Sequence, residues 1–350
     1  GATSISFTGL EPVFIDGGTA TGTGPAGLTR TATMLIFVTP GDADAITIDS
    51  PAAGQNRISG TSGSVAFESI TFTNIRNVVI DTGTNDKADA DGDTITIASD
   101  LVATGLKNLT FMTGSGDDVL VFQTSNLTLP VSGGTFWFDG GTGSDTLTGP
   151  DAGILWSLTG AGSGHLGAAA GLAFSHVEAL VGGSGQDTYV FASGASFGGA
   201  IDGGPGQNGL DYAAYTTAVA VDLGAGTATG TTGISNINLV TGGAGADTLT
   251  GGMGDDTFAG GPGNDTFVFK DGWGEDTLTD ASGNDILDFS AVEAALTFAI
   301  TADGTVSVRD GTSALENATG VDSLIGGAGG NLFVFEDGAA WAGSIAGGTE

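Results

Sequence analysis

Residues 242–268 read GGAGADTLT, GGMGDDTFA and GGPGNDTFV, three nonapeptides in direct succession. Each copy has the form G-G-x-G-x-D-x-U-x, where U is a large apolar residue, so Asp247, Asp256 and Asp265 stand at the same place in their copies. A repeat at a short fixed period indicates a solenoid, in which each repeat is one small structural unit that packs on its neighbours.

The nonapeptide itself predicts a turn followed by a short strand. Glycines at its first, second and fourth positions allow positive φ and a close approach of the backbone. Its last three residues alternate as in a strand, with Leu249, Phe258 and Phe267 predicted to point inward. Two copies then complete one coil of a flattened tube, so that stacking places turn over turn and strand over strand. Further strand phenylalanines predicted to lie in the core are Phe111, Phe122, Phe191, Phe269, Phe333 and Phe335.

The turn aspartates raise an electrostatic problem. Stacked strands lie about 4.8 Å apart, and two unit charges about 5 Å apart repel by roughly 3 kcal/mol at an effective dielectric constant near 20. With 40 acidic residues against seven basic ones, the chain cannot neutralise such columns with lysine or arginine. Calcium can, because it accepts carboxylate and carbonyl oxygens in a more tolerant geometry than magnesium. The alternative is a metal-free, glycine-rich solenoid with solvated acidic turns.

The tandem block resembles the repeats-in-toxin (RTX) family, in which turn aspartates and glycine carbonyls bind calcium between the coils of a parallel β-roll. The resemblance implies an all-β fold, a right-handed parallel β-solenoid with several Ca²⁺ ions bound in its turns. The implied side-chain ligands are Asp247, Asp256 and Asp265, and the implied turn glycines are Gly242, Gly245, Gly251, Gly254, Gly260 and Gly263. Looser copies of the repeat add, by position, Asp118, Asp145, Asp187, Asp276 and Asp285.

Some turns depart from the pattern. Asn208 and Asn331 replace the aspartate in their copies, and because asparagine offers one neutral oxygen we expect these turns to bind calcium weakly or not at all. In the acidic loop 86–93, Asp89, Asp91 and Asp93 alternate as in part of an EF-hand, but the remaining ligands and the flanking helices are missing. A calcium site and a solvated acidic turn remain alternatives there.

A longer repeat accompanies the nonapeptides. Val-Phe pairs end at Phe122, Phe191, Phe269 and Phe335, which are 69, 78 and 66 residues apart. Such repeats are similar to those of very large secreted bacterial RTX surface proteins and adhesins, over roughly residues 61–350. We therefore predict a degenerate β-rich segment at 1–60 and a solenoid of about four long repeats at 61–350, within a longer protein.

Composition excludes several classes of partner. A net charge of −33 argues against nucleic acid and anionic membrane, since both attract lysine and arginine. The chain has no cysteine, so disulfides and thiolate metal sites are excluded. No apolar run approaches the ~18 residues of a membrane span, and the first residues do not form a signal peptide.

No catalytic motif is apparent, and we expect no enzymatic activity. His165 and His176 stand in no triad or metal-binding motif, and Trp156, Trp273 and Trp341 are expected to pack in the core or at the end of a coil. The expected function is structural: a calcium-stabilised segment of a secreted or cell-surface protein that serves adhesion or the assembly of filaments or matrix. The alternative is a calcium-binding secretion or chaperone module of an RTX enzyme or toxin. Besides calcium, expected partners are further copies of the chain, end to end or laterally, or a host surface.

Overall fold

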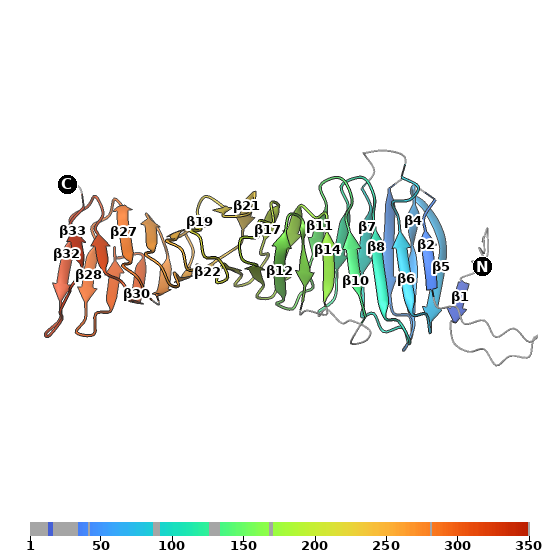
Figure 1. Ribbon diagram of the computed structural model, residues 1–350, viewed down its shortest axis with the longest axis horizontal. Helices are drawn as coiled ribbons and strands as arrows, with labels where there is room; N and C mark the ends of the chain where they lie inside the picture. The colour runs from blue at the N-terminus through green and yellow to red at the C-terminus, as the bar shows by residue number, and fades with distance from the viewer. Residues whose placement is uncertain are drawn as a thin grey trace, which may run out of the picture. The chain divides into compact units, whose positions relative to one another are not determined.

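The computed structural model describes residues 13–16, 34–40, 43–86, 92–125, 134–167, 171–280 and 282–348. Within these ranges all of the regular secondary structure is β-strand, and no helix long and apolar enough to cross a membrane is found among them. The chain divides into two compact units, residues 1–154 with 162–184 and residues 155–161 with 185–350. The predicted all-β class is therefore confirmed for the described part of the chain (Figure 1).

In the first unit, drawn from blue to green in Figure 1, the strands form two sheets, and from β5 to β11 successive strands alternate between them. The strands are β1 (Val13–Asp16), β2 (Met34–Val38), β3 (Asp44–Asp49), β4 (Asn56–Ser62), β5 (Val65–Thr73), β6 (Asn77–Asp81), β7 (Thr94–Ile97), β8 (Asn108–Met112), β9 (Val119–Phe122), β10 (Phe136–Asp139), β11 (Thr146–Thr148), β13 (Ser163–Leu166), β14 (Leu172–Ser175) and β15 (Ala179–Val181). One sheet has the order β1-β5-β4-β3-β7-β9-β11-β15, and the other has the order β2-β6-β8-β10-β14-β13. Pairing is parallel from coil to coil and antiparallel within the hairpins β3–β4–β5 and β13–β14.

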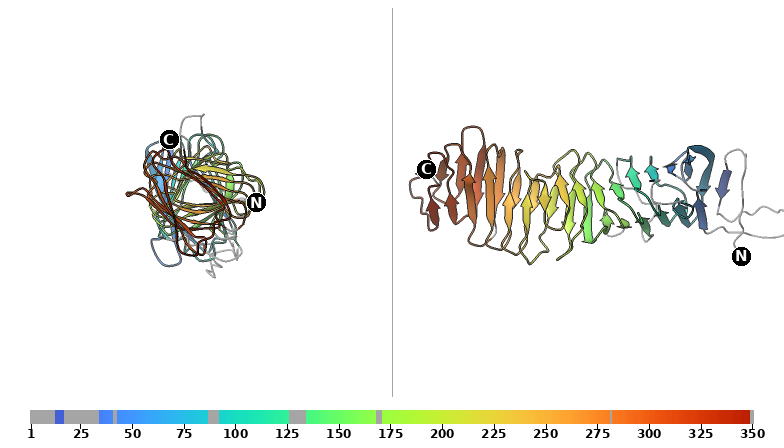
Figure 2. Two further views of the ribbon diagram at one scale, coloured as in Figure 1. Left: turned by 90° about the vertical axis from the view of Figure 1, so that its left-hand side faces the viewer. Right: turned by 90° about the horizontal axis from the view of Figure 1, so that it is seen from above.

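The second unit follows the same plan. Its strands are β12 (Leu155–Gly160), β16 (Thr188–Phe191), β17 (Ala200–Asp202), β18 (Gly209–Asp211), β19 (Ala220–Asp222), β20 (Thr227–Ala228), β21 (Gly233–Ser235), β22 (Leu239–Thr241), β23 (Thr248–Thr250), β24 (Thr257–Ala259), β25 (Thr266–Lys270), β26 (Glu275–Thr279), β27 (Ile286–Ala291), β28 (Thr297–Ile300), β29 (Val306–Arg309), β30 (Ala314–Thr319), β31 (Ser323–Ile325), β32 (Leu332–Phe335) and β33 (Ser344–Ala346). One sheet runs β12-β16-β18-β22-β24-β26-β30-β29-β28-β32, another runs β20-β19-β23-β25-β27-β31-β33, and β17 pairs with β21. From β22 to β27, consecutive strands fall in opposite sheets, which is the connectivity of a solenoid (Figure 2).

The tandem nonapeptides set the geometry of the coil in the second unit. Leu249 of β23 lies beside Phe267 of β25 in a parallel pair, 18 residues further along the chain, so two nonapeptides complete one coil as predicted. Leu249, Phe258 and Phe267 are buried, and the rings of Phe258 and Phe267, from opposite sheets, lie 6.3 Å apart. The alternation of U positions therefore fills a thin core between the two sheets.

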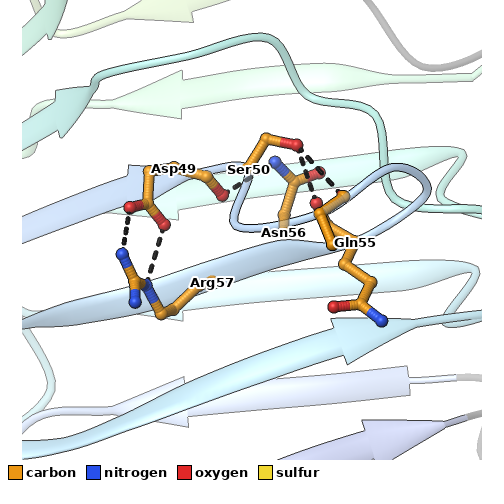
Figure 3. A network of polar contacts seen from close by, with 6 residues as sticks. Asp49, Ser50, Gln55, Asn56 and Arg57 are labelled. Carbon is orange, nitrogen blue, oxygen red and sulfur yellow. Dashed lines mark hydrogen bonds and ion pairs between the residues drawn. The ribbon is translucent and has the colours of Figure 1, made fainter.

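Hydrogen bonds of the Asn56 side chain join the hairpin β3–β4 to the segment around residues 100–103 of the first unit. The buried Asn56 side chain donates from Nδ2 to the carbonyl oxygens of Asp49 and Asp100, both at 3.1 Å, and accepts from the amide of Ala103 at 2.7 Å. Arg57 pairs with the Asp49 carboxylate on the outer side of the same hairpin (Figure 3). These contacts fix the hairpin without any acidic turn.

Most of the predicted core residues are buried. Phe111, Phe122, Phe191, Phe267 and Phe269 are buried, and Trp156 and Trp273 are fully enclosed. The prediction was wrong for Phe335, whose surface is 47% exposed, and Phe333 on the same strand is only half-buried. Phe335 lies on β32, the last strand of its sheet, where only β28 packs beside it.

Replacement of Gly263 by alanine is expected to lower the free energy of unfolding in calcium by ~1–3 kcal/mol, the usual cost of overpacking. A Cβ at this position would lie 2.0 Å from the carbonyl oxygen of Gly245 in the coil below. Gly254 occupies the same place in the neighbouring nonapeptide but has no atom within 4 Å of its Cβ position. The Gly254→Ala control should therefore change stability by less than about 0.5 kcal/mol, as measured by urea denaturation. Equal effects of the two changes would contradict the close stacking of the turns.

Candidate metal centre

Buried turn aspartates form a ladder along one edge of the second unit. The backbone amide of Asp247 donates to Oδ1 of Asp265 at 2.7 Å, and the amide of Asp265 donates to Oδ1 of Asp285 at 2.8 Å. The ladder continues to Asp322, which accepts from the amide of Asp285 at 3.1 Å, and it begins at the amide of Val219, which donates to Asp247 at 2.8 Å. Each carboxylate therefore uses one oxygen to hold the preceding coil.

The second carboxylate oxygens have different surroundings. Oδ2 of Asp247 accepts from the amide of Gly243, and Oδ2 of Asp256 accepts from that of Gly252, both at 2.7 Å. Oδ2 of Asp265 and of Asp276 are buried and accept no hydrogen bond from the described residues. A buried oxygen anion without a partner is costly, so these two atoms indicate a place for a positive charge.

Three carboxylates converge at one point of this edge. One oxygen from each of Asp265, Asp280 and Asp285 lies within 4.8 Å of the other two. Calcium binds oxygen at about 2.3–2.6 Å, so ligands on opposite sides of one ion lie about 5 Å apart, and the observed spacing fits. A Cβ on Gly260 would lie 2.6 Å from Oδ2 of Asp265 and 2.8 Å from Oδ2 of Asp280. Only glycine leaves this space free.

Glycine carbonyls add oxygens between the turns. The carbonyl oxygens of Gly260, Gly245 and Gly254 point at the glycines of adjacent coils, at 2.3 Å, 2.0 Å and 2.4 Å from the Cβ positions of Gly242, Gly263 and Gly274. On the opposite edge, the Cβ position of Gly251 lies 3.6 Å and 3.5 Å from Oδ2 of Asp256 and Asp276. Carboxylate and carbonyl oxygens without nitrogen or sulfur form the donor set that calcium prefers.

A second ladder runs along the first unit. The amides of Asp44, Asp93 and Asp118 donate to Oδ1 of Asp93, Asp118 and Asp145 at 2.8 Å, 2.7 Å and 2.9 Å. The last rung is Glu178, which accepts from the amide of Asp145 at 2.9 Å. Asp44, Asp93, Asp118 and Asp145 are all buried. The same device therefore recurs in both units.

Burial raises the pKa of five of the turn and strand carboxyl groups, namely Asp93, Asp145, Asp256, Asp265 and Asp276. Loss of hydration is the largest cause in each case, and neighbouring carboxylates add to it for Asp145 and Asp276. The pKa rises to about 7 for Asp93 and Asp145, to about 6 for Asp256 and Asp265, and to about 8 for Asp276. Below pH values of about 6–8 these carboxyl groups would bind protons in the absence of a cation, and a cation would then have to displace those protons.

The structure places most, but not all, of the residues predicted from the sequence in the aspartate ladders. The predicted aspartates are all buried: seven lie in turns, namely Asp118, Asp145, Asp187, Asp247, Asp256, Asp265 and Asp285, whereas Asp276 lies on strand β26. Asp187 differs from the rest because its amide donates to the side chain of Asn208 instead of a carboxylate. Asp89 and Asp91 of the EF-hand-like loop lie outside the described residues, whereas Asp93 belongs to the ladder of the first unit.

Several ladder members were not predicted. Asp280 stands where other copies have the first glycine of the nonapeptide, five residues before Asp285, and this placement was the available signal. Glu178, Asp322 and Asn238, whose Oδ1 accepts from the amide of Asn208 at 2.9 Å, each lie two residues after a corner residue with positive φ, namely His176 (53°), Gly320 (78°) and Asn236 (55°). The corner brings a polar side chain to the position that a turn aspartate holds elsewhere.

Stacked parallel coils with buried acidic turns define a β-solenoid that carries candidate cation sites. Residues 232–267 match the model of the RTX calcium-binding nonapeptide repeat, with four copies. This stretch is therefore made of RTX repeats, as the tandem block indicated, and the match supports calcium as the cation. No curated protein matches the chain.

The Asp280→Asn variant is expected to weaken calcium binding at the cluster with Asp265 and Asp285 by about tenfold or more, which corresponds to roughly 1.4 kcal/mol. The change removes one of three converging negative charges while it keeps the size of the side chain. Asp303→Asn is the control, since Asp303 lies in an exposed hairpin turn of the same unit. Isothermal titration calorimetry would measure both, and equal affinities would place Asp280 outside the site.

Proposed function

We propose that this chain is a calcium-stabilised structural segment of a very large secreted bacterial surface protein. In this proposal the coils are right-handed, several Ca²⁺ ions lie in the turns, and the chain catalyses no reaction. The observation that carries the proposal is the burial of aspartates on both edges of the second unit, where Oδ2 of Asp265 on one edge and Oδ2 of Asp276 on the other have no hydrogen-bond partner among the described residues. The RTX match over residues 232–267 supports the identity of the ion.

The residues themselves suggest how calcium would control folding. Asp265 and Asp285 bind the coils together through Oδ1, but their charges oppose close stacking. Calcium would supply the missing positive charge between them. Where calcium is scarce, as in bacterial cytosol, the turns would repel and the chain would stay unfolded and exportable. Where calcium is plentiful, binding to the folded state alone would stabilise it by mass action.

The chain's own surface supports a structural role. Of the two histidines, His176 is exposed and pairs with Asp139 at 2.6 Å, and His165 lies on β13 with Ala173 of β14 opposite. Adhesion and the assembly of filaments or matrix both require a stable extension outside the cell, and a calcium-clamped solenoid could supply it.

The proposal can be tested by stretching the chain between two folded handle domains in optical tweezers. We expect the coils to unfold at clearly higher force in excess calcium than in excess chelator. The same force–extension curve in both solutions would rule out a calcium-stabilised structural role.

The alternative, a secretion or chaperone module, predicts instead that the calcium-loaded chain speeds the refolding of a reporter enzyme fused to it. Sedimentation velocity in calcium would detect assembly of copies end to end or laterally.

A further inference from the structure

The Asn208 turn is closed by an amide. Asn208 is fully buried, and its Nδ2 donates to the carbonyl oxygens of Gly204 at 2.9 Å and Asn236 at 3.0 Å. Its Oδ1 accepts from the amide of Asp187 at 2.9 Å, and its own amide donates to Oδ1 of Asn238 at 2.9 Å. Both protons of Nδ2 are thus used, and the Asn208 side chain itself carries no charge.

The Asp145 turn offers a direct comparison. A Cβ on Gly140 would lie 2.2 Å from the carbonyl oxygen of His176 and 2.7 Å from Oδ2 of Asp145. A Cβ on Gly203 would lie 2.3 Å from the carbonyl oxygen of Asn236 and 2.6 Å from Nδ2 of Asn208. The two turns therefore have the same local geometry. An oxygen of Asp145 without a hydrogen-bond partner among the described residues occupies the place that a donating nitrogen occupies in the Asn208 turn.

A cation does not fit the Asn208 turn. The carbonyl oxygens of Gly204 and Asn236 already accept from Nδ2, and the side-chain oxygen of Asn208 accepts from the amide of Asp187. Asn331 repeats the contacts of the amide nitrogen, since its Nδ2 lies 2.9 Å from the carbonyl oxygens of Gly327 and Gly329 and 2.6 Å from that of Gly347. In these two turns the amide nitrogen binds the carbonyl oxygens that a cation would bind in the aspartate turns.

Aromatic packing stabilises the coils around Asn208. Tyr189 stacks on Trp156 with ring centroids 5.4 Å apart, and Phe191 stacks on Tyr212 at 4.4 Å. Tyr215 packs edge-on against Tyr212 at 5.2 Å. The hydroxyls of Tyr189 and Tyr212 donate to the carbonyl oxygens of residues 202 and 229 at 3.1 Å and 2.7 Å. These contacts join successive coils without any ion.

We propose that residues 185–241, with strand β12, form a block of the second unit that folds without calcium. The Asn208 amide replaces the ion in its turn, and the aromatic stacks supply the core. The block would offer a preformed surface on which the first coil of the calcium-dependent RTX repeats can pair, through β22 with β24 and β19 with β23. The role of the block as a preformed surface rests on the proposed calcium-dependent folding of the tandem repeats. The calcium-free folding of the block itself does not depend on that proposal.

Hydrogen exchange of the whole 350-residue chain, followed by mass spectrometry of its peptides, tests this proposal. In excess chelator near pH 8, we expect peptides from 188–241 to exchange at least tenfold more slowly than peptides from 247–290. Added calcium should slow exchange in 247–290 and leave 188–241 nearly unchanged. Fast exchange of 188–241 in chelator, with protection only in calcium, would overturn the proposal while leaving the calcium-dependent role of the chain intact.

Substitution of Asn208 isolates the amide. In Asn208→Asp, the second oxygen would face two carbonyl oxygens, so peptides 188–241 should lose protection in chelator and regain it in calcium, with one more ion bound per chain. Asn264→Asp is the matched control, since Asn264 is exposed in a tandem turn, and it should leave 188–241 unchanged. If Asn208→Asp keeps its protection in chelator, the amide does not replace an ion. If the hydrogen exchange of peptides from 247–290 does not change with calcium, the proposed function is contradicted instead. The two outcomes are distinguishable because they are measured on different peptides.

Discussion

Removal of calcium is expected to unfold the tandem nonapeptides and to abolish most of the β-sheet circular dichroism that they contribute. The turns at Asp247, Asp265 and Asp285 stack directly upon one another. Each site that binds only the folded state adds roughly 2.7 kcal/mol when calcium exceeds its dissociation constant 100-fold. A few such sites equal the whole stability of an ordinary domain, which is about 5–15 kcal/mol.

The measurement is a calcium titration of the chelated chain, followed by circular dichroism. We expect a cooperative gain of β signal that excess chelator reverses. Magnesium at the same concentration serves as the control, and it should restore much less structure because it demands a stricter octahedron of ligands. A full β spectrum that persists in excess chelator would show that the acidic ladders close without an ion.

The repeat itself was predictable because its geometry is local. Glycines at fixed places permit the turn, and the apolar U residue fixes which face of the short strand is buried. Leu249 and Phe267 therefore lie side by side one coil apart. The stacking of turn aspartates such as Asp265 and Asp285 in a column also followed, since the turns of successive coils lie over one another.

The rest of the ladder depended on information that the period does not contain. Glu178 and Asp322 reach the ladder only because a positive-φ corner at His176 or Gly320 turns the chain two residues earlier. Asp280 joins the cluster because its copy lacks the first glycine. Asn208 was expected to be a weakened site, but the orientation of its amide, which satisfies two carbonyl oxygens, is a tertiary feature that no nonapeptide pattern encodes.

The raised pKa values lead to the second large effect. Burial, as the main cause, raises the pKa to about 6 for Asp256 and Asp265, to about 7 for Asp93 and Asp145, and to about 8 for Asp276. The ordinary value of about 3.9 applies in the unfolded chain. The metal-free fold therefore binds more protons than the unfolded chain over this range, and protons stabilise it.

In excess chelator, the β signal is accordingly expected to be large near pH 5 and to disappear as the pH rises through about 6–8, the range of the folded-state values. A protonated carboxyl group can donate to a turn carbonyl as the Asn208 amide does, so acid would replace calcium. In calcium the same protons compete with the ion, and the apparent affinity should fall between pH 8 and pH 6.

The variant Asp276→Asn separates this explanation from a general effect of net charge. Asp276 has the highest of these pKa values, about 8. An amide in its place can donate a hydrogen bond without first binding a proton from solvent. In excess chelator, the pH at which half of the β signal is lost should therefore be higher in the variant. Asp303→Asn changes the net charge equally, but Asp303 is exposed and its pKa is lowered by hydrogen bonds from Thr301 and Thr305, so its midpoint should not move. If the midpoint pH shifts equally in the two variants, the pH dependence comes from repulsion between charges over the whole chain. If protonation of the buried carboxyl groups controls the midpoint, only the change at the buried Asp276 should move it.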